Sequence, residues 1–249
     1  MVNSGKKMNW GAGLAETESM PRLLIHLEGQ TEEDFVNEIL RDYLLARGFD
    51  DVSARIVGNA RLRHRRGGIR PWPSVRKDIV KHLKEDPTCI ATTMVDFYGL
   101  PQEGDGAWPG RCNTDRAKNI DKAETVESAL LTDVTSEMDR LFNPQRFVPF
   151  VIMHEFEALL FSDCAGFSRG IGRPQLEASL RAIREQFPTP EDINDSPVTA
   201  PSKRVKLLVP GYQKPLLGCL AALEIGLSRI RLECPHFDAW LSRLEALCI

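Results

Sequence analysis

Residues 23–27 read Leu-Leu-Ile-His-Leu and are followed directly by Glu28 and Gly29. A nearly continuous apolar run of this kind is typical of a parallel strand that is covered on both faces. Thr31 is a residue type that often caps a helix, and apolar residues recur at helical spacing after it. The pattern therefore predicts a strand, a tight turn and a helix. The apolar residues of this helix are Phe35, Val36, Ile39, Leu40, Tyr43 and Leu44.

The alternation of strands and helices continues along the first two thirds of the chain. Apolar runs predict further strands over residues 52–57, 89–95 and 147–153. Helical spacing of apolar residues predicts one helix that begins near Ser74 and another over residues 122–138. Such alternation is typical of an α/β fold with a mainly parallel sheet and right-handed crossovers. We therefore expect a sheet of about four strands flanked by helices, with a helical C-terminal part.

Length and composition indicate one globular unit. The 249 residues are expected to form an α/β core over residues 20–165 and a helical region over residues 166–249 that packs on it. Residues 1–19 lack the apolar segment of a secretory signal and are interpreted as a disordered leader. No apolar run reaches the roughly 20 residues of a membrane-spanning helix, so no membrane contact is expected.

The cysteine spacing and the net charge exclude two further classes of protein, zinc-knuckle proteins and polycations that bind nucleic acid through bulk charge. The six cysteines stand far apart, with no Cys-x-x-Cys pair, so the sequence predicts no zinc knuckle and favours a reduced, cytoplasmic protein. A net charge of −3 excludes binding to nucleic acid through bulk positive charge. Any nucleic-acid contact must therefore come from a local cluster of cations.

Acidic residues follow three of the predicted strands at the point where each strand ends. Glu28 follows the first strand and Asp96 the third. Glu155 and Glu157 follow the fourth, and Glu32 lies one helical turn beyond Glu28. Ligands of open α/β sheets bind in the crevice beyond the carboxyl ends of the strands. We therefore expect these acids to lie close together.

A cluster of carboxylates predicts a metal ion. Converging carboxylates repel one another unless a cation neutralises them, and a set of oxygen donors favours Mg²⁺ or Mn²⁺ over Zn²⁺. One or two ions are expected, since a pair of ions activates water and stabilises the leaving oxygen in phosphodiester cleavage. Glu32 also has a plainer interpretation, as an acid that stabilises the first turn of a helix.

Three segments resemble a known family. Residues 27–32, Leu-Glu-Gly-Gln-Thr-Glu, resemble the E-G-x-T-E signature that opens TOPRIM domains of the overcoming-lysogenization-defect (OLD) nucleases. Residues 96–101, Asp-Phe-Tyr-Gly-Leu-Pro, and residues 154–161, His-Glu-Phe-Glu-Ala-Leu-Leu-Phe, resemble later blocks of a bacterial TOPRIM-like family. That family is often encoded beside AAA-type ATPases in phage-defence loci, as in AbiL-like abortive-infection pairs. The resemblance spans residues 22–206 and implies a TOPRIM-like, Rossmann-like fold.

The resemblance also implies roles for the acids. Glu28 corresponds to a metal ligand and candidate general base, and Glu32 to a ligand of a second metal. Asp96 corresponds to the first aspartate of a D-x-D motif. Glu157 or Glu155 fills a late acidic position.

Two further positions follow from the same resemblance. Lys203 resembles a late lysine that stabilises charge in the reaction, with Arg204 beside it as a candidate contact to nucleic acid. Tyr98 stands where the motif has its second aspartate, so a metal site here lacks that ligand or recruits another.

A basic, glycine-rich segment precedes the helix near Ser74. As a cationic loop it is suited to hold phosphates, with an aromatic ring available to stack on a base. Pairing with acids on a partner protein and plain solvation are the other interpretations. The candidate nucleic-acid contacts are Arg61, Arg63, Arg65, Arg66, Arg70 and Trp72.

Together these features lead to the expectation of a metal-dependent nuclease, the effector subunit of an ATPase-coupled defence system. DNA and structured RNA both remain open as substrates, and homo-oligomers are compatible with the sequence. A second hypothesis is a non-catalytic TOPRIM-like module that binds nucleic acid or serves as a scaffold for the ATPase, and the tyrosine in the D-x-D motif favours it. A third, weaker one is a hydrolase of nucleotides or small phosphates.

Overall fold

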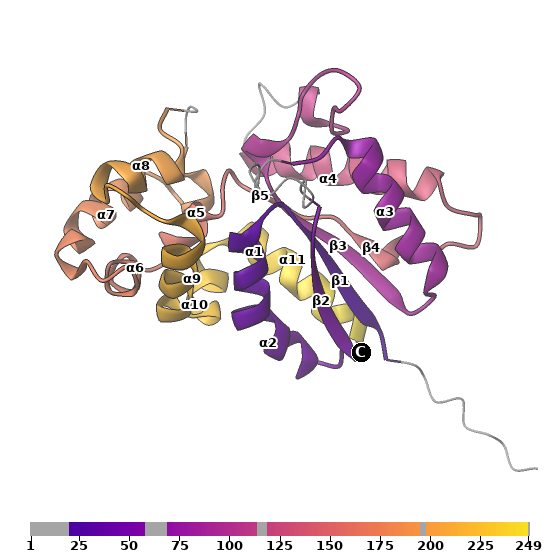
Figure 1. The fold of residues 1–249 in the computed structure, drawn as a ribbon, viewed down its shortest axis with the longest axis horizontal. Helices are drawn as coiled ribbons and strands as arrows, with labels where there is room; N and C mark the ends of the chain where they lie inside the picture. Colours follow the sequence, from indigo (N-terminus) through magenta and orange to yellow (C-terminus); the bar gives the residue numbers. More distant parts are fainter. Residues whose placement is uncertain (1–19, 58–68, 114–118, 195–197, 249) are drawn as a thin grey trace, which may run out of the picture.

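A parallel β-sheet forms the centre of the protein (Figure 1). The computed structural model describes residues 20–57, 69–113, 119–194 and 198–248, so the expected leader lies outside the described residues. The strand order is β2-β1-β3-β4, with β5 paired to β3, and every pair is parallel. The expected α/β fold with a mainly parallel sheet and C-terminal helices is confirmed. The strands are β1 (Arg22–Leu27), β2 (Asp51–Ile56), β3 (Cys89–Asp96), β4 (Phe147–Val148) and β5 (Val151–Ile152).

The predicted strand over residues 147–153 is split into β4 and β5. Pro149 lies at the break, and proline has no N–H to donate to a strand ladder. The buried Thr93 side chain takes over the pairing there. Its hydroxyl accepts the N–H of Phe150 at 2.9 Å and donates to the carbonyl of Phe150 at 2.9 Å. The backbone of the gap is therefore satisfied without a regular ladder.

Helices cover both faces of the sheet. Helices α3 (Trp72–Glu85) and α4 (Asn119–Ser136) lie on one face (Figure 1). On the other lie α1 (Gln30–Phe35), a π-helical turn η1 (Val36–Leu40), α2 (Arg41–Leu45) and α11 (Pro235–Glu245). Each face has its own hydrophobic core, because successive residues of a strand point to opposite faces.

The remaining helices lie to one side of the sheet, at left in Figure 1. In the described part of the chain, no helix combines the length and the apolar character needed to cross a membrane. The side helices are α5 (Glu157–Leu160), α6 (Cys164–Gly170), α7 (Glu177–Arg184), α8 (Pro201–Leu208), α9 (Lys214–Ile225) and α10 (Leu227–Glu233). Short 3₁₀ turns are η2 (Phe97–Gly99), η3 (Arg111–Asn113), η4 (Pro144–Arg146), η5 (Pro174–Leu176), η6 (Pro190–Asp192) and η7 (Ala246–Cys248).

A buried ion pair joins helices from the two faces. His236 Nε2 of α11 lies 2.9 Å from Glu127 Oε1 of α4, and the same oxygen accepts the N–H of Val151 at 2.8 Å. Burial lowers the pKa of His236, but the hydrogen bond and charge of Glu127 outweigh it and raise that pKa above its ordinary value. The protonated imidazole thus stabilises the folded state.

This pair gives the stability of the protein a defined pH dependence. The stabilisation is complete below about pH 6.5, the ordinary pKa of histidine, and is lost as the pH rises through the raised pKa of the folded state. Glu127→Gln keeps an oxygen for Val151 but removes the charge. We expect Glu127→Gln to lower the free energy of unfolding more at about pH 6 than at about pH 9. Denaturant unfolding of both proteins at each pH measures this, and an equal loss at both would contradict it.

Candidate functional site

The acids that follow β1 and β3 meet at the carboxyl edge of the sheet. Leu27 pairs with Met94, which places Glu28 level with the end of β3. The backbone N–H of Asp96 donates to Glu28 Oε2 at 3.2 Å, and Asp96 Oδ1 accepts the N–H of Phe156 at 2.9 Å. The expected convergence of Glu28 and Asp96 is thus present in the structure.

Glu32 and Glu157 approach the same point from two helices. Glu32 lies in the first turn of α1, where its Oε2 accepts the N–H of Gly29 at 3.0 Å. It is therefore both a helix cap and a member of the cluster. Glu157 is the first residue of α5 and is fully buried, and neither of its oxygens has a hydrogen-bond partner of good geometry among the described residues.

Glu155 has a different partner. Its Oε2 accepts the N–H of Ser202 at 2.8 Å, at the start of α8. Its charge still raises the pKa of Asp96 and of Glu157, though less than burial does. We place Glu155 at the edge of the cluster.

Lys214 lies among the four clustered acids, and the sequence analysis missed it. Its Nζ is 3.1 Å from Asp96 Oδ2, 3.1 Å from Glu157 Oε2 and 3.9 Å from Glu32 Oε1. Lys203, which the family resemblance selected, is exposed on α8, and no ion pair joins it to the acids among the described residues. The sequence did offer a signal for Lys214, because Pro215 directly after it marks the start of a helix. A cation at a helix N-terminus is destabilised by the helix dipole, so an acidic partner is expected nearby.

With all four acids ionised, the cluster would hold more buried negative charge than Lys214 can balance. Burial, followed by the charge of neighbouring acids, raises the pKa of Glu28 to about 8 and that of Glu32 to about 7. Burial raises the pKa of Glu157 to about 7 and also raises that of Asp96, while Lys214 lowers both. Ionising all four acids therefore costs free energy that a further cation offsets.

The donor set fits a hard divalent cation. Four carboxylates offer oxygen ligands, and among the described residues the Glu157 carboxylate has Lys214 as its ion-pair partner and no hydrogen bond of good geometry. Across the described ranges, no three His, Cys, Asp or Glu side chains are already arranged around a common metal position. Lys214 Nζ lies between the carboxylates instead. Binding of Mg²⁺ or Mn²⁺ thus requires the side chains to rearrange.

Gly99 makes room for the Glu28 carboxylate. A Cβ at this position would lie 2.7 Å from Glu28 Oε2 and 3.0 Å from Oε1. We expect Gly99→Ala to push Glu28 out of the cluster and to lower the affinity of the cluster for Mn²⁺ by at least about tenfold, as loss of ligand orientation does elsewhere. The fold should survive, because the carboxylate is the flexible end of a side chain. Titration calorimetry and the thermal midpoint, measured together, check this, and an unchanged affinity would show that Glu28 does not contribute to metal binding.

Tyr98 packs as a core residue at the D-x-D position. Its ring stacks on His154 at 5.1 Å between centroids and 27° between planes, and its N–H donates to the carbonyl of His154 at 3.3 Å. An aromatic contact therefore stands where the resemblance expects a carboxylate, and the four clustered acids are left as the candidate metal ligands.

Two of the arginines predicted to contact nucleic acid have partners within the protein, and four lie outside the described residues. Arg70 is held by Asp78 at 2.8 Å. Arg204 donates to the carbonyl of Thr199 at 2.8 Å and covers the ring of Phe187. Arg61, Arg63, Arg65 and Arg66 lie outside the described residues.

The predicted stacking role of Trp72 is wrong. Its side chain is buried at the start of α3, with its ring 4.9 Å from that of Trp108, and its Nε1 donates to Asp133 at 2.6 Å. The prediction failed because it took Trp72, next to a basic segment, to be exposed, whereas the ring is buried. The α3–α4 core instead encloses it.

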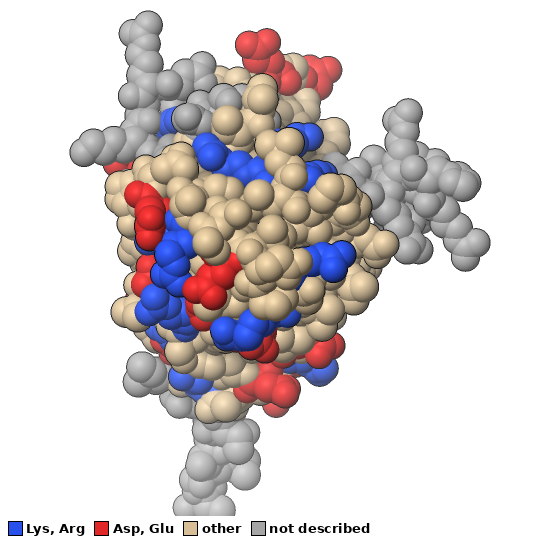
Figure 2. Space-filling model, turned by 90° about the vertical axis from the view of Figure 1, so that its left-hand side faces the viewer, with Lys and Arg blue, Asp and Glu red and all other residues tan. Residues whose placement is uncertain are grey.

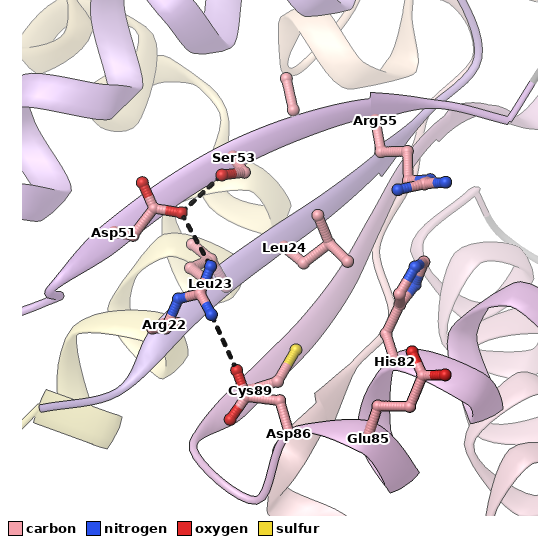
Figure 3. A pocket seen from close by; sticks show the side chains of 11 residues that line it. Arg22, Leu23, Leu24, Asp51, Ser53, Arg55, His82, Glu85, Asp86 and Cys89 are labelled. Atoms are coloured by element: carbon pink, nitrogen blue, oxygen red, sulfur yellow. Dashed lines mark hydrogen bonds and ion pairs between the residues drawn. The ribbon is translucent and has the colours of Figure 1, made fainter. Parts of the chain in front are cut away.

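A pocket of about 320 Å³ lies toward the amino ends of the strands, away from the acid cluster (Figure 3). Arg22, Asp51 and Cys89, the first residues of β1, β2 and β3, help to line it. Arg22 pairs there with Asp51 at 3.6 Å and with Asp86 at 3.1 Å. Arg22 is thus already paired with acids of the pocket, which lies toward the amino ends of the strands. The acid cluster is therefore the stronger candidate site.

Comparison with known proteins places the chain in a family. No curated protein and no solved structure matches the chain. One family model matches residues 27–245, a range that contains the four clustered acids, Lys214 and α11. The chain therefore belongs to the family described as "Domain of unknown function (DUF4276)".

Proposed function

We propose that this protein is a Mg²⁺- or Mn²⁺-dependent nuclease of the TOPRIM type that hydrolyses phosphodiester bonds of DNA or structured RNA. The observation that carries the proposal is the cluster of Glu28, Glu32, Asp96 and Glu157 at the carboxyl edge of a parallel sheet. Its buried negative charge exceeds that of its one lysine, which is the electrostatic setting that hard divalent cations occupy.

The four acids would hold the cation. A bound ion of this type polarises a phosphoryl oxygen and lowers the pKa of a bound water. Glu28 is the candidate general base: its Oε2 accepts the N–H of Asp96, and Oε1 is then the oxygen that accepts a proton from the attacking water. Lys214 takes the role of the charge-stabilising cation that the resemblance gave to Lys203.

We further propose a cytoplasmic effector that works with an AAA-type ATPase. Helix α9, which begins with Lys214, carries three exposed leucines on one face, Leu216, Leu220 and Leu223. An exposed apolar face favours contact with a partner. Figure 2 shows the side of the molecule formed by the side helices, where Lys and Arg alternate with Asp and Glu among uncharged residues. This mixed face suits a protein partner better than a nucleic-acid backbone.

The test is a cleavage assay on plasmid DNA and on total tRNA with Mn²⁺, Mg²⁺ or EDTA. The wild type is compared with Glu28→Ala, each with and without an ATPase encoded beside it. Metal-dependent cutting that the variant lacks supports the proposal and identifies the substrate class. Absence of cutting in every condition, with the partner present, overturns it.

A second candidate function is a non-catalytic binding module. The position of Lys214 favours it, because an ammonium that contacts three of the acids is itself a counter-ion. Tyr98, stacked on His154 in place of an acid, favours it as well. Calorimetry separates the two candidates, since a module without a metal site shows no saturable uptake of Mn²⁺.

A further inference from the structure

Lys214 is the more exposed partner in its ion pairs with three of the four clustered acids. Its side chain is 31% exposed, whereas those of Asp96, Glu32 and Glu157 are 9%, 3% and 0% exposed. The Lys214 side chain thus reaches solvent, whereas the three carboxylates that it contacts are buried.

Lys214 also takes the place that a metal ion needs. Its Nζ contacts oxygens of Asp96, Glu157 and Glu32 at 3.1, 3.1 and 3.9 Å. No other lysine or arginine of the described residues forms an ion pair with these acids. Two cations so close together in a buried site repel each other strongly. A divalent ion and the Lys214 ammonium therefore exclude each other from the centre of the cluster.

We infer that Lys214 is an internal counter-ion which a divalent cation must displace, so that it lowers the affinity of the site for metal. The inference rests on the proposed function, because it takes the four acids as the metal ligands. Displacement moves the ammonium toward solvent, where it is placed to meet an anionic group such as a substrate phosphate. The same side chain then neutralises the acids in the empty site and the substrate in the filled one.

The lysine can move without the helix that carries it. Its four-carbon stem is flexible, and Lys214 is the first residue of α9, so no earlier helical turn encloses it. The body of α9 packs against α1 and α5, the helices that carry Glu32 and Glu157. A swing of the side chain is therefore sufficient, and α9 stays packed.

The test measures Mn²⁺ binding to the full chain by titration calorimetry. Lys214→Met keeps an unbranched side chain, one heavy atom shorter, and removes its charge. We expect this variant to bind Mn²⁺ at least about tenfold more tightly than the wild type, since a repulsive charge at contact distance is gone. The matched control is Lys206→Met, an exposed lysine on α8, which should bind Mn²⁺ as the wild type does.

Stability provides a readout that does not depend on tight binding. Without metal, Lys214→Met leaves the four acids without their counter-ion, so its thermal midpoint in EDTA should fall below that of the wild type. Mn²⁺ should then raise the midpoint of the variant more than that of the wild type.

Amine labelling of the wild type covers the case in which Lys214→Met does not fold. We expect Mn²⁺ to increase the modification of Lys214 by an amine-reactive reagent, measured by mass spectrometry, and to leave that of Lys206 unchanged. Labelling of Lys214 that stays constant or falls with Mn²⁺ overturns the inference.

The outcomes also distinguish the inference from the proposed function. If the wild type binds Mn²⁺ and Lys214→Met binds it equally or more weakly, the lysine assists the metal and the inference is wrong, while the nuclease proposal stands. If neither protein takes up Mn²⁺ or Mg²⁺, the metal site itself is absent, and the proposed function fails together with the inference.

Discussion

Asp96→Asn is expected to reduce metal-dependent cleavage by at least about a hundredfold. Asp96 is the centre of the cluster: Oδ2 contacts Lys214, Oδ1 accepts the N–H of Phe156, and its own N–H donates to Glu28. Asparagine has the same shape and keeps an oxygen for Phe156, so the backbone around the site should remain in place. What the variant loses is one buried negative charge and one ligand oxygen. The measurement is the single-turnover rate with saturating Mn²⁺.

The control for this prediction is Glu33→Gln. Glu33 lies on the same helix as Glu32 but accepts a hydrogen bond from Gln30 at 2.9 Å, outside the cluster. This variant should cleave at the wild-type rate, which would show that the loss of one negative charge outside the cluster does not by itself impair cleavage. If Asp96→Asn retains wild-type cleavage, the reaction takes place elsewhere on the molecule.

Trp240→Ala is expected to lower the free energy of unfolding by about 3–5 kcal/mol. Trp240 is buried on α11, and its ring stacks on Phe150 at 4.5 Å and 13°. Its Nε1 also donates to Thr92 Oγ1 of β3 at 2.9 Å. The substitution therefore opens a cavity against the sheet and removes a buried hydrogen bond. Denaturant unfolding at a pH near neutrality measures the loss.

Leu232→Ala is the control for the C-terminal helices. Leu232 is exposed on α10, so its truncation should change the free energy of unfolding by less than about 0.5 kcal/mol. Trp240→Phe should fall between the two, since it keeps an aromatic ring and loses the hydrogen bond to Thr92. A loss below about 1 kcal/mol for Trp240→Ala would show that α11 is not part of the sheet's core.

Local patterns predicted the parts of the fold that depend on neighbours in the chain. The apolar run Leu23–Leu27 predicted β1, and the spacing of Phe35, Val36 and Leu40 predicted the helical segment that follows it in the chain. The acids Glu28 and Asp96 were found because the end of a buried parallel strand is a recognisable position. The boundary at Pro149 was missed, since a short irregular break satisfied by Thr93 leaves no periodic signal.

Residues that act across long separations were predicted less well. Trp72 was expected to be exposed beside the basic segment, but Trp108 and Asp133 enclose it. The helix with Trp240 was expected in a C-terminal region packed on the core, and it covers one face of the sheet itself. Neither the contacts of Trp72 nor those of Trp240 can be predicted from the helical spacing of apolar residues, because their partners lie far away in the sequence.

The parallel α/β sheet and the acids at the carboxyl ends of its strands can be predicted from local patterns, because the apolar run of a buried strand and the residue that follows it are neighbours in the chain. Which lysine meets those acids depends on tertiary packing. Lys214 lies 118 residues from Asp96 along the chain, and their 3.1 Å contact arises from the packing of α9 against α1 and α5. The identity of a buried counter-ion depends on which elements pack together, and that choice is made by the whole core rather than by any one segment.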